Sequence, residues 1–405
     1  MNTVNSSSPD ERLVLLDFIR GVAVLGILVM NIQSFTMPFA RYANPLIGFN
    51  LEGVDYAVWW LSFVFFEQKF ITLFSLLFGV GLSLFAQRLE LAGVWQPHRH
   101  YKRMFWLFII GLCHAYLIWY GDILTMYAIV GFVVYRLNDK SVVYLVGLAL
   151  FCLFIPYCLF IVFEMSLEYI PAEEIEKWLL LGDAIEDSMT AEIAALNGSW
   201  FDIQQQRMTL AIELQLNVLF YYFRIIGLML LGMAFYKMKV FQLKLAYGYY
   251  IVVFIFMVSF GGYLTLSALP QAEITSISQA GVMIYSEIAR YWGSLLMALG
   301  YLSLLIVTGR YFHAKKWTIY LSQIGRMALT NYLLQSILCT FLVYGTGFAL
   351  FGKLSPLQQI CIVFVVWLIL AVFSNFWLKR FLYGPAEWLW RSLTYGVKQP
   401  MAKRG

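Results

Sequence analysis

Ionisable side chains inside an apolar segment are the first sign of chemistry in this chain. Residues 12–31, RLVLLDFIRGVAVLGILVMN, carry Asp17, Arg20 and Asn31. A charged side chain at mid-bilayer costs about 3 kcal/mol, so such groups usually face a bundle interior or a water-filled cavity. Asp17 and Arg20 share a helix face and can pair, whereas Asn31 lies roughly 21 Å beyond Asp17 along the axis. We therefore predict that one helix lines both ends of a site.

A histidine and an aspartate in GLCHAYLIWYGDILTMYAIVG form the second candidate. His114 should lie about 15 Å into a helix starting near Met104, in its outer half, and Asp122 should cap the next helix. An imidazole oriented by a carboxylate can act as a general base. Asn31, at a comparable depth, could donate a hydrogen bond to a thioester oxygen or oxyanion. A structural histidine that links two helices is the alternative reading.

Polar residues also recur in GRMALTNYLLQS, where Asn331 and Gln335 are one helical turn apart. Such a ladder either joins helices or lines a channel. Arg326 and Arg20 both fall near the inner surface, so they could bind phosphates entering from the cytoplasm. Pairing of Arg20 with Asp17 alone is the competing interpretation.

Three further charged residues fall near the outer boundary. Glu67 and Lys69 could flank a cavity mouth beside Asn31, or serve as ordinary interface anchors. Arg224 could bind an anionic substrate, although snorkelling to the membrane surface is the simpler expectation. The remaining histidines fall in basic segments that we predict to be cytoplasmic loops: His98, His100 and His313.

The composition predicts an integral membrane protein. Of 405 residues, 61% are hydrophobic and 13% charged, against about 45–50% and about 25% in soluble domains. The long apolar runs favour helices over a barrel. We read the net charge of +5 as topology rather than as nucleic-acid affinity. All five cysteines lie in apolar runs without metal-ligand spacing, so no metal is expected.

The fold expected is all-α, with about ten crossings and both termini in the cytoplasm. That arrangement places on the inner side all but seven of the 28 Lys and Arg residues, as the positive-inside rule requires. Residues 53–66 are predicted to be an interfacial or re-entrant helix. The expected crossings are 13–37, 68–87, 104–120, 122–136, 141–163, 213–236, 245–267, 287–308, 318–350 and 357–378.

We expect residues 1–405 to form a single membrane domain. Residues 164–210 are acidic and should form short amphipathic helices outside the membrane, as a solvated cap or as a lid over a substrate. Residues 379–405 form a basic, Trp-rich tail, which predicts an amphipathic helix on the inner surface that starts at Pro385. The absence of an inverted repeat disfavours a transporter.

These motifs together resemble the YeiB-like family of bacterial membrane proteins, a domain of unknown function. The segments that carry the resemblance are LDFIRGVAVLGILVMNI, KFITLFSLLFGVG, GLCHAYLIWYGDILTMYAIVG, GRMALTNYLLQS and GPAEWLWRSLTY. The first helix is also similar to that of the heparan-α-glucosaminide N-acetyltransferases, in Asp17, Arg20, Gly21 and Asn31. That resemblance implies acyl transfer from cytoplasmic acyl-coenzyme A, with an intramembrane Asn and a luminal His. The Asn maps to Asn31, but residues 32–52 contain no histidine.

We therefore expect a multi-pass acyltransferase of the bacterial inner membrane. Arg20 and Arg326, with Asp17, Asn331 and Gln335, would hold acyl-coenzyme A. The acceptor would be a hydroxyl or amine of a small molecule, glycan or lipid. Membrane lipids are the other expected partners, nucleic acid is not, and a homodimer is compatible with the sequence. A transporter or exporter, or a non-catalytic lipid-binding protein, are the alternatives left open.

Overall fold

The computed structural model describes residues 9–43, 51–91, 97–167, 169, 181–217, 219–242, 246–268 and 277–403. Within them the regular structure is helical, and a single antiparallel bridge joins Phe381 to Ala402. The longer helices are α1 (Pro9–Thr36), α4 (Lys69–Leu91), α5 (Pro97–Leu117), α7 (Val142–Leu167), α11 (Leu219–Lys237), α12 (Tyr247–Ser267), α13 (Ile277–Tyr311) and α16 (Pro356–Arg380). The shorter ones are α2 (Phe39–Ala43), α3 (Gly53–Phe65), α6 (Leu124–Val134), η1 (Tyr135–Leu137), α9 (Leu181–Leu196), α10 (Trp200–Asn217), η2 (Val240–Gln242), α14 (Lys316–Arg326), α15 (Ala328–Val343) and α17 (Pro385–Tyr395).

The described helices confirm a helical membrane protein. Six stretches are long and apolar enough to cross a bilayer: Val14–Thr36, Gly53–Leu91, Val142–Phe163, Tyr247–Ser267, Tyr285–Tyr311 and Pro356–Arg380. Two bent pairs, α10 with α11 and α14 with α15, raise that number to eight if each pair is one span. The count of ten crossings and the assignment of sides remain predictions.

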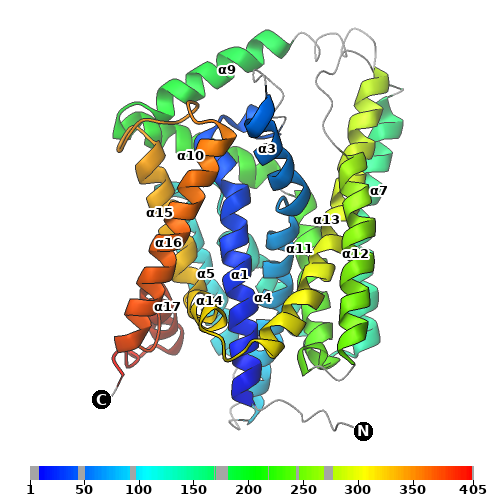
Figure 1. The fold of residues 1–405 in the computed structure, drawn as a ribbon, viewed down its shortest axis with the longest axis vertical. Helices are drawn as coiled ribbons and strands as arrows, with labels where there is room; N and C mark the ends of the chain where they lie inside the picture. Colours follow the sequence, from blue (N-terminus) through cyan, green and yellow to red (C-terminus); the bar gives the residue numbers. More distant parts are fainter. Residues whose placement is uncertain are drawn as a thin grey trace.

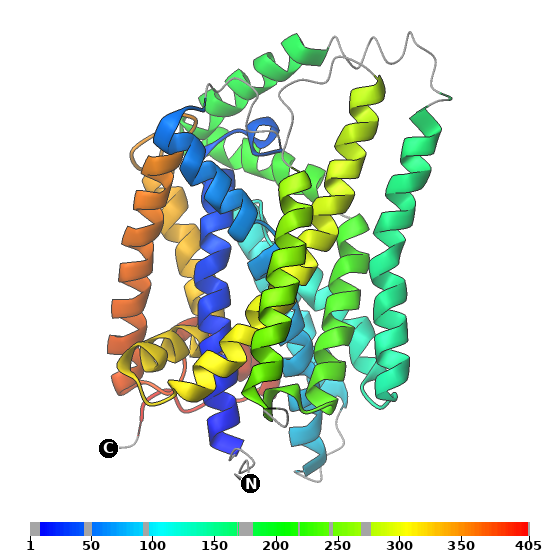
Figure 2. The same ribbon diagram turned by 45° about the vertical axis from the view of Figure 1, so that its right-hand side comes forward.

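Helix α1 lies inside the bundle, and other helices form its rim (Figure 1). In the most apolar window of α1, 67% of residues are buried, against 17% in α12 and 22% in α16. Figures 1 and 2 show α7, α12 and α13 gathered on one side of α1, with α15 and α16 on the other. The apolar side chains exposed on the rim suit contact with lipid tails.

Glycines set the closest helix contacts. A Cβ on Gly325 of α14 would lie 1.8 Å from the carbonyl oxygen of Asp17, and one on Gly21 would lie 2.0 Å from that of Leu321. Likewise, a Cβ on Gly79 of α4 would lie 2.0 Å from the carbonyl oxygen of Met229 on α11. Small residues let backbones approach this closely in membranes, so Gly79 serves the packing of α4 on α11.

Three expected segments differ from the prediction. Residues 318–350 are not one straight crossing, because α14 and α15 meet at a bend of 82°. Polar side chains recur along α14, as in an interfacial helix, and α15 alone runs into the bundle. Residues 122–136 form the short α6, followed by η1. Residues 53–66 contain α3, which forms one apolar stretch with α4, and the two helices are separated by a turn at residues 66–68, where Gln68 has a φ of +60°.

The described ends of the chain lie at one end of the bundle. Helix α1 begins where α17 packs, and α9 lies across the opposite end (Figures 1 and 2). The predicted acidic segment contains the helices α9 and α10, and residues 170–180 lie outside the described part. The structure thus confirms helices in this segment.

The tail is docked on the bundle. Helix α17 starts at Pro385, as predicted. Its Glu387 carboxylate accepts the backbone N–H groups of Leu329 at 2.7 Å and Thr330 at 3.1 Å, which are free donors in the first turn of α15. The indole of Trp390 donates to the carbonyl of Arg103 at 2.8 Å. The tail therefore connects α15 to α5 at this end of the bundle.

Candidate functional site

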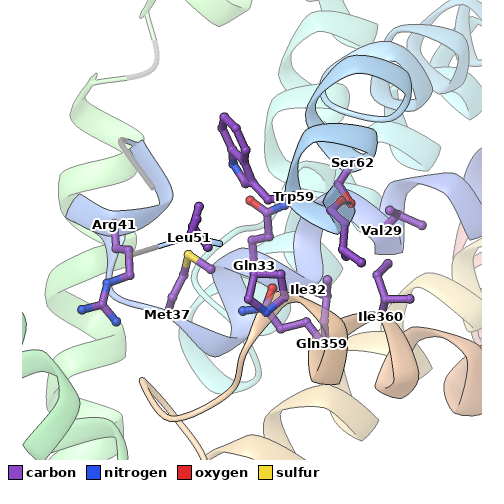
Figure 3. Close-up of a pocket in the computed structure, with 12 residues that line it drawn as sticks. Val29, Ile32, Gln33, Met37, Arg41, Leu51, Trp59, Ser62, Gln359 and Ile360 are labelled. Carbon is purple, nitrogen blue, oxygen red and sulfur yellow. Dashed lines mark hydrogen bonds between the residues drawn. The ribbon is translucent and has the colours of Figure 1, made fainter. Parts of the chain in front are cut away.

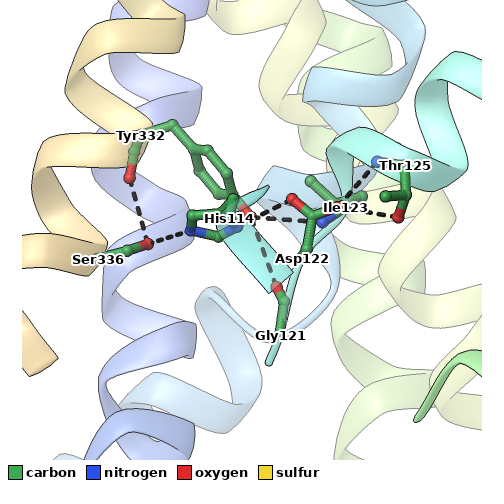
Figure 4. A network of polar contacts seen from close by, with 7 residues as sticks. All are labelled: His114, Gly121, Asp122, Ile123, Thr125, Tyr332 and Ser336. Carbon is green, nitrogen blue, oxygen red and sulfur yellow. Dashed lines mark hydrogen bonds and ion pairs between the residues drawn. The ribbon is translucent and has the colours of Figure 1, made fainter. Parts of the chain in front are cut away.

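His114 lies at the centre of a buried polar network that joins α5 to α15 (Figure 4). Its Nδ1 atom is 2.9 Å from Oδ1 of Asp122, and its Nε2 atom is 2.8 Å from Oγ of Ser336. His114 is fully buried, and Ser336 is 1% exposed. In the tautomer with the proton on Nδ1, that nitrogen donates to Asp122 and Nε2 can accept the Ser336 hydroxyl.

The turn between α5 and α6 fixes the carboxylate. The other oxygen of Asp122, Oδ2, accepts the backbone N–H and the hydroxyl of Thr125, both at 2.8 Å. These bonds close the first turn of α6, as predicted for Asp122. Gly111 allows α5 to come this close, because a Cβ there would lie 2.6 Å from the Thr125 nitrogen. The local chain thus aims Oδ1 at the imidazole.

Ser336 is the residue that sequence reasoning missed. It belongs to α15, 222 residues after His114, and its Oγ is also 3.3 Å from the carbonyl of Tyr332. The phenol of Tyr332 approaches the carbonyl of Gly121 at 3.4 Å, and its ring centroid is 5.0 Å from that of His114. The only signal in the sequence was the polar spacing of GRMALTNYLLQS, which does not reveal its partner.

Ser336, His114 and Asp122 follow one another in the order found where a histidine activates a hydroxyl nucleophile. A hydroxyl faces a base, and a carboxylate orients that base. The same network also ties two helices together, which is the structural reading predicted for His114. The structure therefore brings His114 and Asp122 together, as predicted, and adds the hydroxyl of Ser336.

Asn31 faces the same region without touching His114. It is half-buried, and its side chain makes no hydrogen bond among the described residues. On α1 it shares a face with Phe35, one turn later, and Phe35 stacks on Trp119 with ring centroids 4.0 Å apart. The Trp119 ring in turn meets the edge of the His114 ring at 6.2 Å. Two aromatic rings therefore lie between the face of Asn31 and the histidine.

The opposite face of α1 lines a cavity of about 400 Å³ between α3 and α16 (Figure 3). Val29, Ile32 and Gln33 supply this wall, and Trp59 and Gln359 lie across from it. Successive residues of a helix turn by about 100°, which places Asn31 away from the cavity. His114 does not line it either, so this cavity is separate from the network.

The end of α1 predicted to be cytoplasmic carries a cluster of arginines around one carboxylate. Arg20 donates to Asp17 at 3.0 Å, which confirms that they pair, and each side chain stays 25% exposed. The charges of Arg326 and Arg391 also act on the Asp17 carboxylate. Arg103 stacks over Trp390 at 4.4 Å and is close to the charges of Arg20 and Arg391. Positive charge thus exceeds negative charge at this end.

The other residues predicted to bind a donor have different surroundings. Arg326 is exposed and donates to the carbonyl of Leu382 at 2.8 Å. Asn331 is fully buried and bonds Ile324 and Ser374, each at 2.9 Å. Gln335 donates to Val24 at 3.2 Å. The ladder of Asn331 and Gln335 therefore joins α15 to α14, α16 and α1.

Of the three charged residues predicted near the outer boundary, Arg224 and Lys69 are buried and Glu67 is partly exposed. Arg224 is 3% exposed and bonds the hydroxyls of Thr72 and Ser294, so the expectation that it snorkels is wrong. Lys69 is fully buried and donates to the carbonyl of Phe63 at 2.9 Å. Glu67 pairs with Arg290 at 2.7 Å. The neighbouring hydroxyl and carbonyl groups replace water around these charges.

Two histidines lie elsewhere than predicted. His98 and His100 belong to α5 and not to a loop, because α5 begins at Pro97. His98 is exposed, whereas His100 is fully buried, with Nε2 3.0 Å from the carbonyl of Gly131 and its ring stacked 3.7 Å from Tyr135. The sequence HRHYKR is polar overall and so resembles a loop, although one face of the helix it forms packs on α6. Among the described residues, no group of three His, Cys, Asp or Glu side chains could hold a metal ion.

The fold and the network define a helical integral membrane protein with a buried serine–histidine–aspartate network. The family model described as "Protein of unknown function (DUF418)" matches residues 235–397. The chain is 31% identical to the uncharacterized protein YeiB of Escherichia coli, over 96% of this chain and 98% of the relative. It is also 31% identical to the uncharacterized protein YxaH of Bacillus subtilis, over 100% of this chain and 99% of the relative.

A third relative, an uncharacterized 39.9 kDa protein in the amylase 3' region of Bacillus acidopullulyticus, is 28% identical over 97% of this chain and 96% of the relative. No solved structure matches the chain. The protein belongs to the YeiB-like family, and these relatives are bacterial.

Proposed function

We propose that the protein is a membrane-embedded acyltransferase of the bacterial inner membrane, which moves an acyl group from acyl-coenzyme A through Ser336 to an acceptor hydroxyl or amine. The observation that carries this proposal is the Ser336–His114–Asp122 arrangement, with both hydrogen bonds under 3 Å. It refines the role expected for His114, because its free nitrogen already faces a hydroxyl of the protein.

In the first half-reaction, Ser336 Oγ attacks the thioester carbonyl of the donor. His114 Nε2 takes the hydroxyl proton as the new oxygen–carbon bond forms, and Asp122 stabilises the imidazolium. The carbon–sulfur bond then breaks, and the proton on His114 passes to the departing thiolate. Free coenzyme A and an ester on Ser336 are the products. Phe35 and Trp119 lie between Asn31 and the network, so the predicted role of Asn31 as an oxyanion donor is not part of this step.

In the second half-reaction, the acceptor occupies the place of the departed thiol. His114 removes the proton from the acceptor hydroxyl or amine, which attacks the ester carbonyl on Ser336. The ester bond breaks, and the proton returns to Ser336 Oγ. Asp122 keeps Nδ1 protonated in both directions, so Nε2 remains the atom that exchanges protons.

The charge at the inner end supports a phosphate-bearing donor. Arg20, Arg326 and Arg391 surround a single carboxylate, Asp17, and arginine forks suit phosphate oxygens. Helix α15 leads from this end toward the network, and its axial rise from Ala328 to Ser336 is about 12 Å. A long donor with phosphates at one end and a thioester at the other fits that separation.

Trapping the acyl group on Ser336 is the decisive test. The purified protein would be incubated with radiolabelled acetyl-coenzyme A without an acceptor, denatured, and analysed by peptide mass spectrometry. We expect label on the peptide that contains Ser336, and none in Ser336→Ala or His114→Ala. His313→Ala is the matched control, since His313 is exposed and bonds only a local carbonyl, that of Arg310. Absence of label in a protein that binds coenzyme A would refute the covalent route, and absence of binding would refute the donor.

A further inference from the structure

A second cavity, of about 370 Å³, lies among α4, α7, α11 and α13 in the predicted outer half of the bundle. Arg224 and Tyr221 of α11 line it together with Glu287 of α13, and Gln68 and Pro156 close it. It shares no residue with the His114 network.

Arg224 gives this cavity a positive pole. Its Nη2 atom donates to Thr72 Oγ1 at 3.0 Å and to Ser294 Oγ at 2.8 Å, and its guanidinium lies 4.4 Å above the Tyr291 ring. Among the described residues no carboxylate comes within ion-pair distance of it. Arg224 is 97% buried among neutral acceptors, and burying a guanidinium in this way costs free energy unless an anion pairs with it.

Glu287 gives the same cavity a negative pole. Its carboxylate and that of Glu67 share a single guanidinium, since Arg290 Nη2 bonds Glu287 and Nη1 bonds Glu67 at 2.7 Å. Arg290 is the one ion-pair partner that the described residues give these two carboxylates, and Lys69 and Arg224 are the other cations nearby. The Glu287 side chain is 34% exposed, so its carboxylate is accessible to a cation. Positive and negative groups thus line one cavity without pairing to each other.

The wall formed by α7 faces lipid. Only 28% of its apolar window is buried, and Leu159, Val162 and Phe163 are 38%, 62% and 49% exposed. Phe160 of the same helix lines the cavity. The rigid Pro156 lies inside α7, where proline removes a backbone hydrogen bond and bends a helix. A molecule that lies in the bilayer can therefore reach the cavity with its head while its chains remain in lipid.

We propose that this cavity binds the zwitterionic headgroup of a phospholipid, with the phosphate on Arg224 and the ammonium on Glu287. An anionic lipid would satisfy Arg224 and be repelled by Glu287. A free fatty acid would leave Glu287 without a counter-charge. The dipolar lining therefore selects the zwitterion.

Native mass spectrometry of the full-length, delipidated protein tests this assignment, with dioleoyl phosphatidylethanolamine and dioleoyl phosphatidylglycerol added at matched concentrations. We expect at least fivefold more ethanolamine adduct than glycerol adduct. Arg224→Gln should lower the ethanolamine adduct at least fivefold. Arg207→Gln should leave it unchanged, because it removes another buried arginine, on α10, that does not line the cavity.

Glu287→Gln decides the headgroup independently. It leaves Arg290 with Glu67 alone, so the cavity becomes positive and should now prefer phosphatidylglycerol. Equal binding of both lipids by the native protein, or native-like binding by a folded Arg224→Gln, would overturn the proposal. Where Arg224→Gln fails to fold, the preference of Glu287→Gln alone decides. Ethanolamine binding that persists in His114→Ala separates this site from acyl transfer.

Discussion

His114 Nε2 on α5 and Ser336 Oγ on α15 are 2.8 Å apart, although 222 residues separate them in the chain. Neither side chain has another side-chain partner at its shared atom, and both are withdrawn from solvent. A neutral histidine whose Nδ1 donates to a carboxylate has Nε2 as its acceptor. This geometry makes the chemistry of the site depend on the contact between two helices.

Replacing Asp122 with Asn should disable the base while the bundle stays folded. The amide supplies one acceptor oxygen in place of two, so it cannot serve both His114 and Thr125. We expect transfer to fall about 10²- to 10⁴-fold, measured as release of coenzyme A. Thr125→Val is the control, because it removes only the hydroxyl bond at 2.8 Å on the far oxygen. Equal losses in both variants would mean that Asp122 acts only as a cap.

Replacing Arg326 with Gln should weaken donor binding. Its exposed guanidinium is free to add a phosphate to its contact with Leu382, and a charge-assisted bond contributes about 1.5–3 kcal/mol. We therefore expect the Kd for coenzyme A to rise at least tenfold by calorimetry, with a smaller rise at high salt. Arg380→Gln, at the same end of the bundle, should bind normally. Identical Kd values would remove Arg326 from the donor site.

The free energy of unfolding should fall as the pH rises through the range in which a buried glutamate of the predicted extracytoplasmic cap loses its proton. Glu192 of α9 is 6% exposed and accepts the Phe39 N–H at 3.1 Å, and burial raises its pKa to about 7, from 4.5. The folded state therefore binds the proton more tightly than the unfolded state, and stability decreases between about pH 4.5 and 7. Glu192→Gln should abolish this slope in thermal unfolding, whereas exposed Glu186→Gln should keep it. A native slope of zero would contradict the burial of the carboxyl.

The contact between α1 and α14 should not tolerate a methyl group. Gly325→Ala would place a Cβ 1.8 Å from the Asp17 carbonyl oxygen, so α14 must move, at a cost of about 1–3 kcal/mol. We expect a lower Tm and weaker coenzyme A binding, since α14 carries Arg326. Gly147→Ala, on α7 with nothing within 4 Å of the new methyl, should match the native protein. An unchanged Tm in Gly325→Ala would show that these helices are not held this closely.

The sequence alone determined the class of protein and much of the local structure. Its apolar runs and scarcity of charge predicted a helical membrane protein, because lipid requires every backbone polar group to be satisfied within the segment. Interactions between residues close in the sequence were also predicted correctly. Asp17 pairs with Arg20 within one helical turn, Asp122 closes the first turn of α6, and Pro385 starts α17. Each of these relationships spans only a few residues.

The tertiary structure decided which polar groups meet. Ser336 became the partner of His114 only when α15 was placed against α5, and Arg224, expected to reach the surface, became the buried wall of a cavity. The bend between α14 and α15 and the packing of His100 likewise depend on neighbouring helices. Hydropathy reports the cost of leaving a group in lipid, whereas the identity of its partner depends on how the helices pack.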